Sequence, residues 1–326
     1  MKPFAHTNAG SVEEAVQLLA KFKGKAKLNA GGTDLLGVLK DRVLPDYPEA
    51  IINIKTIPGL NTIEEDEEGI SIGALTTLVD IITSPLIEKY CPLLKEAAVT
   101  VASPQIRNIA TIGGNLCQDT RCWYYRYPDK IGGMIDCFRK GGKRCPAVSG
   151  ENQYHAVMGA KKCFAVCPSD TAIALTALGA MLTAVGSEGT RTIPVEEFYT
   201  TLRNVLTPNE MITAIFIPKP SPVVRQNFLK FTLRKPIDFA IVSAASLITL
   251  EQGVCTGTRI VLGAVAHRPV RALKAEEFLK GKELTEETAA EAAELALAGA
   301  KPLSKNAYKL EIAKTLVKRA VRGDSS

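Results

Sequence analysis

Apolar positions in the first two-thirds of the chain fall into short runs separated by glycine, proline and polar residues. From Val12 to Leu19 they recur at helical spacing, and Ser11 with Glu14 three residues later forms a capping-box pattern that begins this helix. The same patterns predict helices at 33–36, 75–84, 86–102 and 171–178, and strands at 25–30, 50–55, 61–64, 69–73, 180–185, 192–195 and 210–218. The segment 103–108 is expected to be a loop.

The last third of the chain has a different order of elements. Three long strand-like runs at 227–233, 240–250 and 258–266 come first, and helical patterns near 274–280, 285–300 and 307–321 follow. Strands followed by helices indicate an α+β domain, in which helices cover one face of an antiparallel sheet.

A proline-rich segment, 219–222, separates these two patterns. Proline interrupts both helices and strand pairing, so the domain boundary is expected here. The sequence thus predicts a first domain at 1–220, with parts at about 1–55 and 56–220, and a second domain at 223–326.

Composition and charge narrow the class of protein. The 326 residues are 46% hydrophobic and 23% charged, which is ordinary for a globular chain. The net charge of +6 includes no run of five or six like charges, so a nucleic-acid partner is not indicated. No apolar stretch reaches the roughly 18 residues that cross a bilayer, and the N-terminus lacks a signal-peptide core. We expect a cytoplasmic protein.

Two glycine pairs lie at positions where a helix is expected to begin, each beside polar residues. One, Gly31-Gly32, follows the strand at 25–30, and the other, Gly113-Gly114, lies in the segment 111–115. Glycine lets the backbone approach a ligand closely, and free N–H groups at a helix start bind anions. Together the two turns could hold a diphosphate. Neither has the spacing of a Rossmann or Walker motif, and a purely structural role stays open for each.

Six of the eight cysteines lie directly after the second glycine pair: Cys117, Cys122, Cys137, Cys145, Cys163 and Cys167. In a reducing compartment, clustered cysteines bind metal more often than they form disulfides. A [4Fe-4S] cluster needs four thiolates; a zinc loop and a disulfide-stapled insertion are the alternatives. The absence of close C-x2-C pairs argues against structural zinc. His155 is better explained as a hydrogen-bonding residue than as a ligand.

Two motifs together resemble the FAD-binding medium subunit of the xanthine oxidase family of molybdenum hydroxylases. They are Ala30-Gly31-Gly32-Thr33-Asp34-Leu35-Leu36 and Thr111-Ile112-Gly113-Gly114-Asn115. The resemblance covers essentially the whole chain, and the pair is specific where either motif alone would not be. It implies an α+β fold: a two-part FAD-binding domain of the PCMH/vanillyl-alcohol-oxidase type, and a C-terminal domain with a three-stranded antiparallel sheet and a helix bundle, as in carbon monoxide dehydrogenase flavoproteins.

The resemblance also implies which residues hold FAD. The two glycine turns would bind the diphosphate, Asp170 would accept from the adenosine ribose, Lys230 would lie near the flavin ring, and Ile212 would supply an apolar contact. The full set is Asn29, Ala30, Gly31, Gly32, Thr33, Asp34, Leu35, Thr111, Gly114, Asn115, Asp170, Ile212 and Lys230. A solvated strand lysine is the alternative for Lys230.

The cysteine-rich segment, about 117–167, resembles an insertion in the FAD subunits of 4-hydroxybenzoyl-CoA reductase and of certain bacterial aldehyde oxidoreductases. Its landmarks include Arg121-Cys122-Trp123-Tyr124-Tyr125, Gly142-Lys143-Arg144-Cys145 and Lys162-Cys163-Phe164-Ala165. In those relatives the loop holds a [4Fe-4S] cluster. This implies the ligands Cys122, Cys137, Cys145 and Cys163, and leaves Cys117 and Cys167 spare. If the insertion folds separately from the glycine turns, FAD should be retained when these cysteines are replaced.

The resemblance implies an oxidoreductase subunit that transfers electrons without turning over the organic substrate itself. FAD and the [4Fe-4S] cluster would connect an external partner, such as ferredoxin or NAD, with separate [2Fe-2S] and molybdopterin chains in a dimer of heterotrimers. The substrate of the complex would be 4-hydroxybenzoyl-CoA, with an aldehyde or a purine such as xanthine as the alternative. A stand-alone FAD-dependent oxidoreductase and a non-enzymatic metal-binding module are the other classes that the residues allow.

Overall fold

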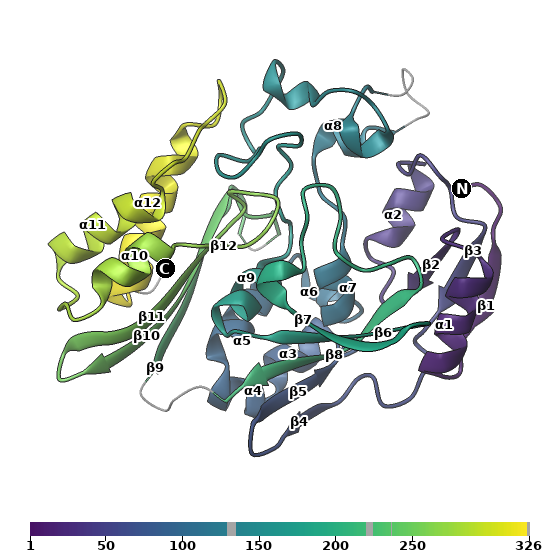
Figure 1. The fold of residues 1–326 in the computed structure, drawn as a ribbon, viewed down its shortest axis with the longest axis horizontal. Coiled ribbons are helices and arrows are strands. Elements are labelled where there is room, and N and C mark those ends of the chain that lie inside the picture. The colour runs from purple at the N-terminus through teal and green to yellow at the C-terminus, as the bar shows by residue number, and fades with distance from the viewer. Residues whose placement is uncertain (129–134, 220–223, 236, 325–326) are drawn as a thin grey trace.

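The computed structural model describes residues 1–128, 135–219, 224–235 and 237–324. Three sheets succeed one another across the molecule, with the purple N-terminal segment at one end and the yellow C-terminal helices at the other (Figure 1). The expected domain boundary falls on 220–223, outside the described residues. Within the described part of the chain, no helix is long and apolar enough to cross a membrane.

The N-terminal sheet is parallel and has the strand order β1-β3-β2. Its elements are β1 (Ala5–Asn8), α1 (Val12–Lys21), β2 (Ala26–Asn29), α2 (Leu35–Lys40) and β3 (Ala50–Asn53). The Ser11 hydroxyl caps α1 by accepting from the N–H of Glu14, as the capping-box pattern predicts. The Glu14 carboxylate accepts from Gly10, one residue before the expected position.

The middle sheet is antiparallel and has the order β4-β5-β8-β6-β7. Its strands are β4 (Ile63–Glu65), β5 (Gly69–Gly73), β6 (Met181–Gly186), β7 (Gly189–Pro194), which η3 (Val195–Glu197) follows, and β8 (Glu210–Pro218). The helices that share its core are α3 (Leu78–Thr83), α4 (Pro85–Tyr90), α5 (Pro92–Val99), α7 (Ile112–Cys117) and α9 (Asp170–Ala177), and the short α6 (Pro104–Arg107) contacts α3. Because β8 pairs with both β5 and β6, segments far apart in the sequence form one unit. The expected loop at 103–108 was wrong in part, since Ser103 caps the single turn α6 there.

The C-terminal sheet is antiparallel and has the order β12-β11-β10-β9. Its elements are β9 (Val224–Phe231), β10 (Val242–Glu251), β11 (Val254–Gly263), β12 (Val270–Arg271), α10 (Leu273–Leu279), α11 (Glu286–Ala296) and α12 (Tyr308–Arg322). The three long strands and three helices are those expected from the sequence. The added strand β12 has two residues, which is too short for a period-two pattern to reveal.

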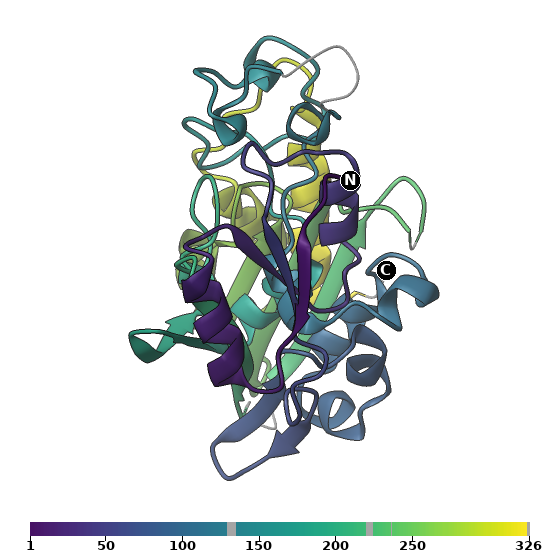
Figure 2. The ribbon, with the colours of Figure 1, turned by 90° about the vertical axis from the view of Figure 1, so that its right-hand side faces the viewer.

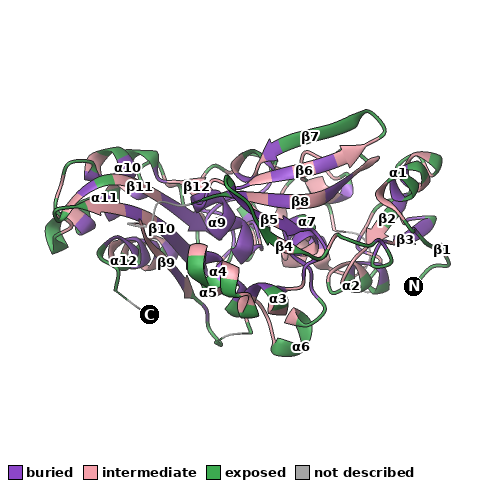
Figure 3. Cartoon of the chain, turned by 90° about the horizontal axis from the view of Figure 1, so that it is seen from below, coloured by how far each residue is buried: buried purple, intermediate pink, exposed green. Residues whose placement is uncertain are grey.

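Both faces of this C-terminal sheet are buried. Along the strands, Phe228, Ala245 and Val261 pack into the core of the middle unit, whereas Leu229, Ala244 and Leu262 pack under α10, α11 and α12. Neighbouring strand residues point to opposite faces, which explains why both cores draw on adjacent positions. The helix α9 lies between the two sheets and is buried along its whole length (Figure 3).

The cysteine-rich insertion contains short helices, α8 (Trp123–Arg126), η1 (Phe138–Lys140) and η2 (Pro146–Val148), and lies beside the start of α12 in both views (Figures 1 and 2). Buried side chains hold it there. The Asn306 amide donates to the backbone carbonyl of His155 at 3.1 Å, and the Lys309 ammonium donates to the same carbonyl at 3.0 Å. The Asn152 amide oxygen accepts from the N–H of Lys305. The insertion is therefore packed against the C-terminal domain.

Candidate functional site: a cavity between two glycine turns

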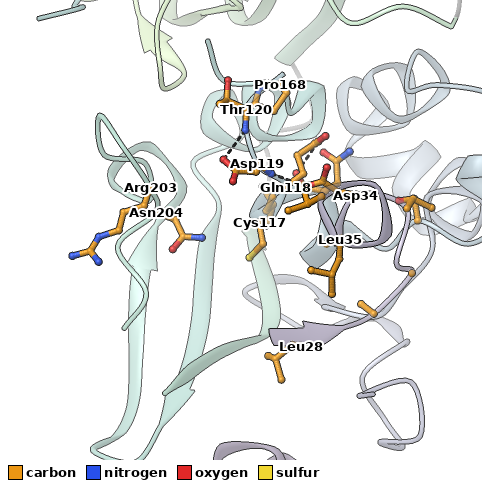
Figure 4. A pocket seen from close by; sticks show the side chains of 18 of the residues that line it. Leu28, Asp34, Leu35, Cys117, Gln118, Asp119, Thr120, Pro168, Arg203 and Asn204 are labelled. Atoms are coloured by element: carbon orange, nitrogen blue, oxygen red, sulfur yellow. Dashed lines mark hydrogen bonds between the residues drawn. The ribbon is translucent and has the colours of Figure 1, made fainter. Parts of the chain in front are cut away.

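A cavity of about 660 Å³ lies where the N-terminal sheet, α7 and the loop after η3 meet. In Figure 4, Leu28 and Leu35 line one side, Cys117 to Thr120 lie at the centre, and Arg203 and Asn204 line the other side. This volume falls within the range usual for small-molecule sites. All thirteen residues predicted to hold FAD line this cavity.

The first glycine turn packs directly against the segment before α7. A Cβ atom on Gly31 would lie 2.9 Å from the carbonyl carbon of Ile109 and 3.0 Å from the Cα of Ala110, closer than ordinary contacts. Gly32 has φ +72°, a conformation that glycine adopts without strain. The Oδ1 of Asn29 is buried without a partner among the described residues. At this turn, a ligand in the cavity can approach the backbone closely, and the Asn29 Oδ1 atom is available as a hydrogen-bond acceptor.

The second glycine pair forms the first turn of α7. Thr111 is its N-cap and accepts from the N–H of Gly114 at 3.1 Å. A Cβ atom on Gly113 would lie 2.8 Å from the carbonyl oxygen of Ala74, so this glycine is required by packing. The Oδ1 of Asn115 accepts from the hydroxyls of Ser169 and Thr171 at 2.6 and 2.7 Å. That oxygen orients the start of α9.

Asp34 connects the first turn to the insertion. It precedes α2, but its side chain makes no cap hydrogen bond. Its carboxylate instead accepts from the N–H of Asp119 at 2.8 Å and forms ion pairs with Arg126 at 2.7 Å and with Arg121 at 3.0 Å. Asp is a common helix-capping residue, but two arginines of the insertion hold the Asp34 carboxylate instead.

Asp170 and Lys230 form a buried ion pair at the cavity wall. Their side chains are 7% and 4% exposed, and Lys230 Nζ lies 2.7 Å from Asp170 Oδ2 and 2.8 Å from the carbonyl of Thr100. Burial raises the pKa of Asp170 from its usual value, although the Lys230 charge acts to lower it. Lys230 is not a solvated strand lysine. Ile212, on β8, is 6% exposed.

Further cavity residues were missed from the sequence because they stand outside the glycine motifs: Arg121, Arg139, Tyr199, Arg203, Phe239 and His267. Arg121 lies over the ring of Phe239 at 4.7 Å. Arg139 belongs to the insertion, and burial acts to lower its pKa. The charges of Cys163 and Asp119 outweigh that effect, so the pKa of Arg139 is raised.

Two of the four cysteines predicted as metal ligands, Cys122 and Cys137, belong to one small buried cluster. The pKa of Cys122 is raised to about 12, mainly by burial, and the charges of Cys137 and Cys163 act in the same direction. Burial likewise raises the pKa of Cys137, with added effects from Cys163 and Cys145. Across the described residues, no three or more His, Cys, Asp or Glu side chains are arranged as a metal site.

His155 lies beside Cys122, whereas the other two cysteines of the insertion, Cys117 and Cys167, lie elsewhere. The Nε2 atom of His155 lies 3.3 Å from Cys122 Sγ, and burial lowers the His155 pKa to about 4, so the ring is neutral at pH 7. Burial raises the pKa of Tyr199 well above its usual value, and the charges of Cys167 and Cys117 add to the effect. Cys117 and Cys167 therefore lie near Tyr199.

Known proteins resemble this chain along its whole length. Residues 2–220 match the family model described as the FAD binding domain in molybdopterin dehydrogenase, and residues 227–323 match the CO dehydrogenase flavoprotein C-terminal domain. The chain is 32% identical to the aldehyde oxidoreductase FAD-binding subunit PaoB of Escherichia coli (strain K12), with 96% of each chain covered. It is 31% identical to the carbon monoxide dehydrogenase medium chain of Hydrogenophaga pseudoflava, over 95% of this chain and 93% of that one.

A solved structure shares the fold. The carbon monoxide dehydrogenase from Hydrogenophaga pseudoflava that lacks the Mo-pyranopterin moiety matches with a TM-score of 0.79 and 29% identity, covering 100% of both chains. The expected architecture, an FAD-binding domain followed by a carbon monoxide dehydrogenase flavoprotein C-terminal domain, is confirmed. The chain belongs to the family of FAD-binding medium subunits of xanthine oxidase-type molybdenum hydroxylases, which are flavoprotein subunits of oxidoreductase complexes.

Proposed function

We propose that this chain binds FAD in the cavity between the two glycine turns and transfers electrons within a molybdenum hydroxylase complex. The observation that carries the proposal is the contact of Gly31 with the backbone of Ile109 and Ala110, which brings both turns to one cavity. Bound FAD would convert two-electron chemistry into single-electron steps.

The residues of the cavity fit a dinucleotide. Gly31 and Gly32 allow the backbone to approach a diphosphate, and the unpaired Asn29 Oδ1 can accept from a ligand hydroxyl. Lys230 donates to Oδ2 of Asp170, and Oδ1 can accept from a ribose hydroxyl. Lys230 then acts through Asp170, a different role from the expected one near the flavin ring.

The test of FAD binding is the identity of the released cofactor. Acid precipitation of the purified yellow protein should release all colour as FAD, since no covalent attachment is expected. Colour retained in the pellet, or FMN in the supernatant, would contradict this proposal.

We further propose that Cys122, Cys137, Cys145 and Cys163 hold a [4Fe-4S] cluster, which relays electrons to or from the flavin. The loop resemblance supports this choice of ligands, and Cys122 and Cys137 belong to one small buried cluster. Four thiolates are the usual ligands of such a cluster. Cys137 is held in place by a tight turn, in which its carbonyl accepts from Lys140 and Gly142 at 2.8 Å.

A matched pair of variants tests this ligand set. Anaerobically purified protein should contain about four irons and four sulfides per chain. Cys163→Ser should lose most of this iron, because a hydroxyl replaces a soft thiolate poorly, and Cys167→Ser should keep it. Loss of iron from Cys167→Ser, with iron kept by Cys163→Ser, would mean that Cys167 is the fourth ligand. Stoichiometric zinc without iron would refute the cluster.

The partners that we propose are a [2Fe-2S] chain and a molybdopterin chain, in a cytoplasmic dimer of heterotrimers. Full-length similarity to the carbon monoxide dehydrogenase medium chain supports this assembly. An aldehyde is the better-supported substrate of the complex, given the similarity to the aldehyde oxidoreductase subunit; 4-hydroxybenzoyl-CoA is supported by the loop resemblance alone. Purification of a tagged chain from its native source should recover both partners. A monomer that oxidises an aldehyde unaided would contradict the proposal.

The insertion also bears on the external partner, for which ferredoxin and NAD were both expected. Residues 117–167 contain nine Lys and Arg against four Asp and Glu, which is +5 of the chain's total of +6. Among the described residues of the insertion, the exposed charged side chains are Lys143, Arg144, Lys161 and Lys162 against Asp136 and Glu151. This excess of positive charge favours an acidic protein carrier such as ferredoxin. Reduction or oxidation of the complex by ferredoxin should therefore slow as ionic strength rises. Faster exchange with NAD(H) than with ferredoxin would contradict this preference.

A further inference from the structure

The insertion holds the Asp34 carboxylate, and Arg126 forms the shorter of its two ion pairs. Arg126 Nη2 lies 2.7 Å from Asp34 Oδ1, and Arg121 Nη2 lies 3.0 Å from the same oxygen. The other oxygen, Oδ2, accepts from the N–H of Asp119 at 2.8 Å (Figure 4). The side chains of Asp34 and Arg126 are each 17% exposed. Both carboxylate oxygens are therefore bound by the insertion.

Arg126 is itself fixed by the segment before α8. Its Nε donates to the carbonyl of Thr120 at 2.7 Å, and its Nη2 donates to the carbonyl of Asp119 at 2.9 Å as well as to Asp34. Among the described residues, Asp34, Asp119 and Thr120 line the cavity, whereas Arg126 does not. An effect of Arg126 on a ligand in the cavity must therefore pass through Asp34 or through this segment.

The direction of the Asp34 side chain matters because of its place in the first glycine turn. An aspartate that precedes a helix usually accepts from the first N–H groups of that helix. Such a bond would occupy backbone donors of the turn and place a negative charge beside them, where the diphosphate is proposed to bind. Two negative groups at one site repel each other. Asp34 makes no such bond, and the arginines of the insertion hold its carboxylate instead.

We propose that Arg126 is a positioning residue for FAD, which keeps the Asp34 carboxylate on the insertion and leaves the first glycine turn to the diphosphate. This inference rests on the proposed FAD site and requires no metal at the cysteines. The guanidinium also balances the charge of Asp34, which lowers the repulsion between that carboxylate and the ligand. Loss of Arg126 would weaken this hold, so that the carboxylate competes with the diphosphate for the same donors.

The experiment measures FAD binding by the full complex. Arg126→Gln removes the charge, and Arg126→Lys keeps the charge but loses the planar fork. Arg144→Gln is the matched control, because Arg144 lies in the same insertion with its side chain 79% exposed and pairs with Asp136 instead. FAD per chain is measured first. Each protein is then stripped of flavin, and its Kd for FAD is measured from the change in flavin fluorescence during titration.

Arg126→Gln should raise the Kd for FAD by about tenfold, the size expected for one hydrogen bond between charged groups. Arg126→Lys should raise it less, and Arg144→Gln should leave it unchanged. Equal Kd values in Arg126→Gln and Arg144→Gln would overturn this inference and leave the proposed FAD site intact. A wild-type complex that contains no FAD and binds none would instead overturn the proposed FAD site.

Asp34→Asn distinguishes action through Asp34 from simple support of the insertion. In this background, Arg126→Gln should change the Kd by about twofold at most, because the charge that Arg126 holds is gone. An equal change in both backgrounds would mean that Arg126 only holds the segment through Thr120 and Asp119, and would overturn the assignment. If Arg126→Gln alone retains no FAD, recovery of binding in the double variant would support the proposal, and no recovery would overturn it.

Discussion

Replacing Gly31 with alanine tests the contact on which the cavity depends. The added methyl group would meet the carbonyl carbon of Ile109 at 2.9 Å and the Cα of Ala110 at 3.0 Å, whereas ordinary contacts begin at 3.4 Å. All of these neighbours are backbone atoms, so no side chain can rotate away, and one of the two turns must move. Overpacking of this kind costs about 1–3 kcal/mol.

Gly37→Ala is the control for this substitution. Gly37 lies six positions further along, within α2, and nothing stands within 4 Å of the position that its Cβ would take. Alanine in a helix should stabilise the protein by about 0.5–1 kcal/mol relative to glycine. The two variants should therefore differ by about 1.5–4 kcal/mol in unfolding free energy, although they make the same chemical change.

The assay measures FAD per chain after desalting, from the ratio of flavin to protein absorbance, together with unfolding in urea. Gly31→Ala should lose FAD and unfold at lower urea concentration, because displacement of the turn removes backbone N–H groups from the diphosphate. Gly37→Ala should keep its FAD. Full FAD occupancy in Gly31→Ala, with stability equal to that of Gly37→Ala, would show that the contact between the turns does not form the site.

Three further substitutions probe charged side chains of the cavity wall and of the contact between the insertion and α12. Lys230→Met leaves the buried Asp170 without its cation, which should cost about 3–5 kcal/mol of unfolding free energy; adding Asp170→Asn should restore most of it, and additive losses would contradict the ion pair. Burial lowers the pKa of Lys309 to about 7. The unfolded state then binds more protons than the folded state between pH 7 and about 10. The unfolding free energy of the wild-type protein should therefore increase with pH across this range. Lys309→Met should lack this increase, and an equal dependence of unfolding free energy on pH in both proteins would refute the reasoning. Asp34→Asn weakens the attraction to Arg126 and should speed proteolysis within the insertion; an unchanged cleavage rate would show that the pair is not needed.

The sequence predicts the elements well where one pattern dominates a segment. The glycine turns and the three C-terminal strands have strong local signals. Glycine acts within a few residues, and the strands are long apolar runs because both faces of their sheet are buried. The short elements α6 and β12 were missed. The strand β12 exists only because its residues pair with Val261 and Leu262 of β11, a contact that local composition does not encode.

The candidate site shows the same limit. The glycine motifs and the family resemblance pointed to thirteen of the residues that line the cavity, but they could not give the direction of each side chain. Asp34 has the residue type of a helix cap, yet it faces Arg121 and Arg126, more than eighty positions away in the chain. Asp170 and Lys230 were expected in separate roles and are paired with each other. Long-range electrostatic partners decide these orientations, and a single sequence does not reveal them.

FAD was expected to be retained in cysteine variants if the insertion folds separately from the glycine turns. The insertion instead contacts the first glycine turn and the C-terminal domain. At one end, Asp34 of the first glycine turn binds its arginines; at the other, Asn306 and Lys309 bind its backbone. Emptying the cysteine set would loosen the Asp34 contact, and the turn proposed to bind the diphosphate would lose part of its support. Loss of some FAD together with iron is therefore expected from ligand substitutions, because the same carboxylate belongs to both structures.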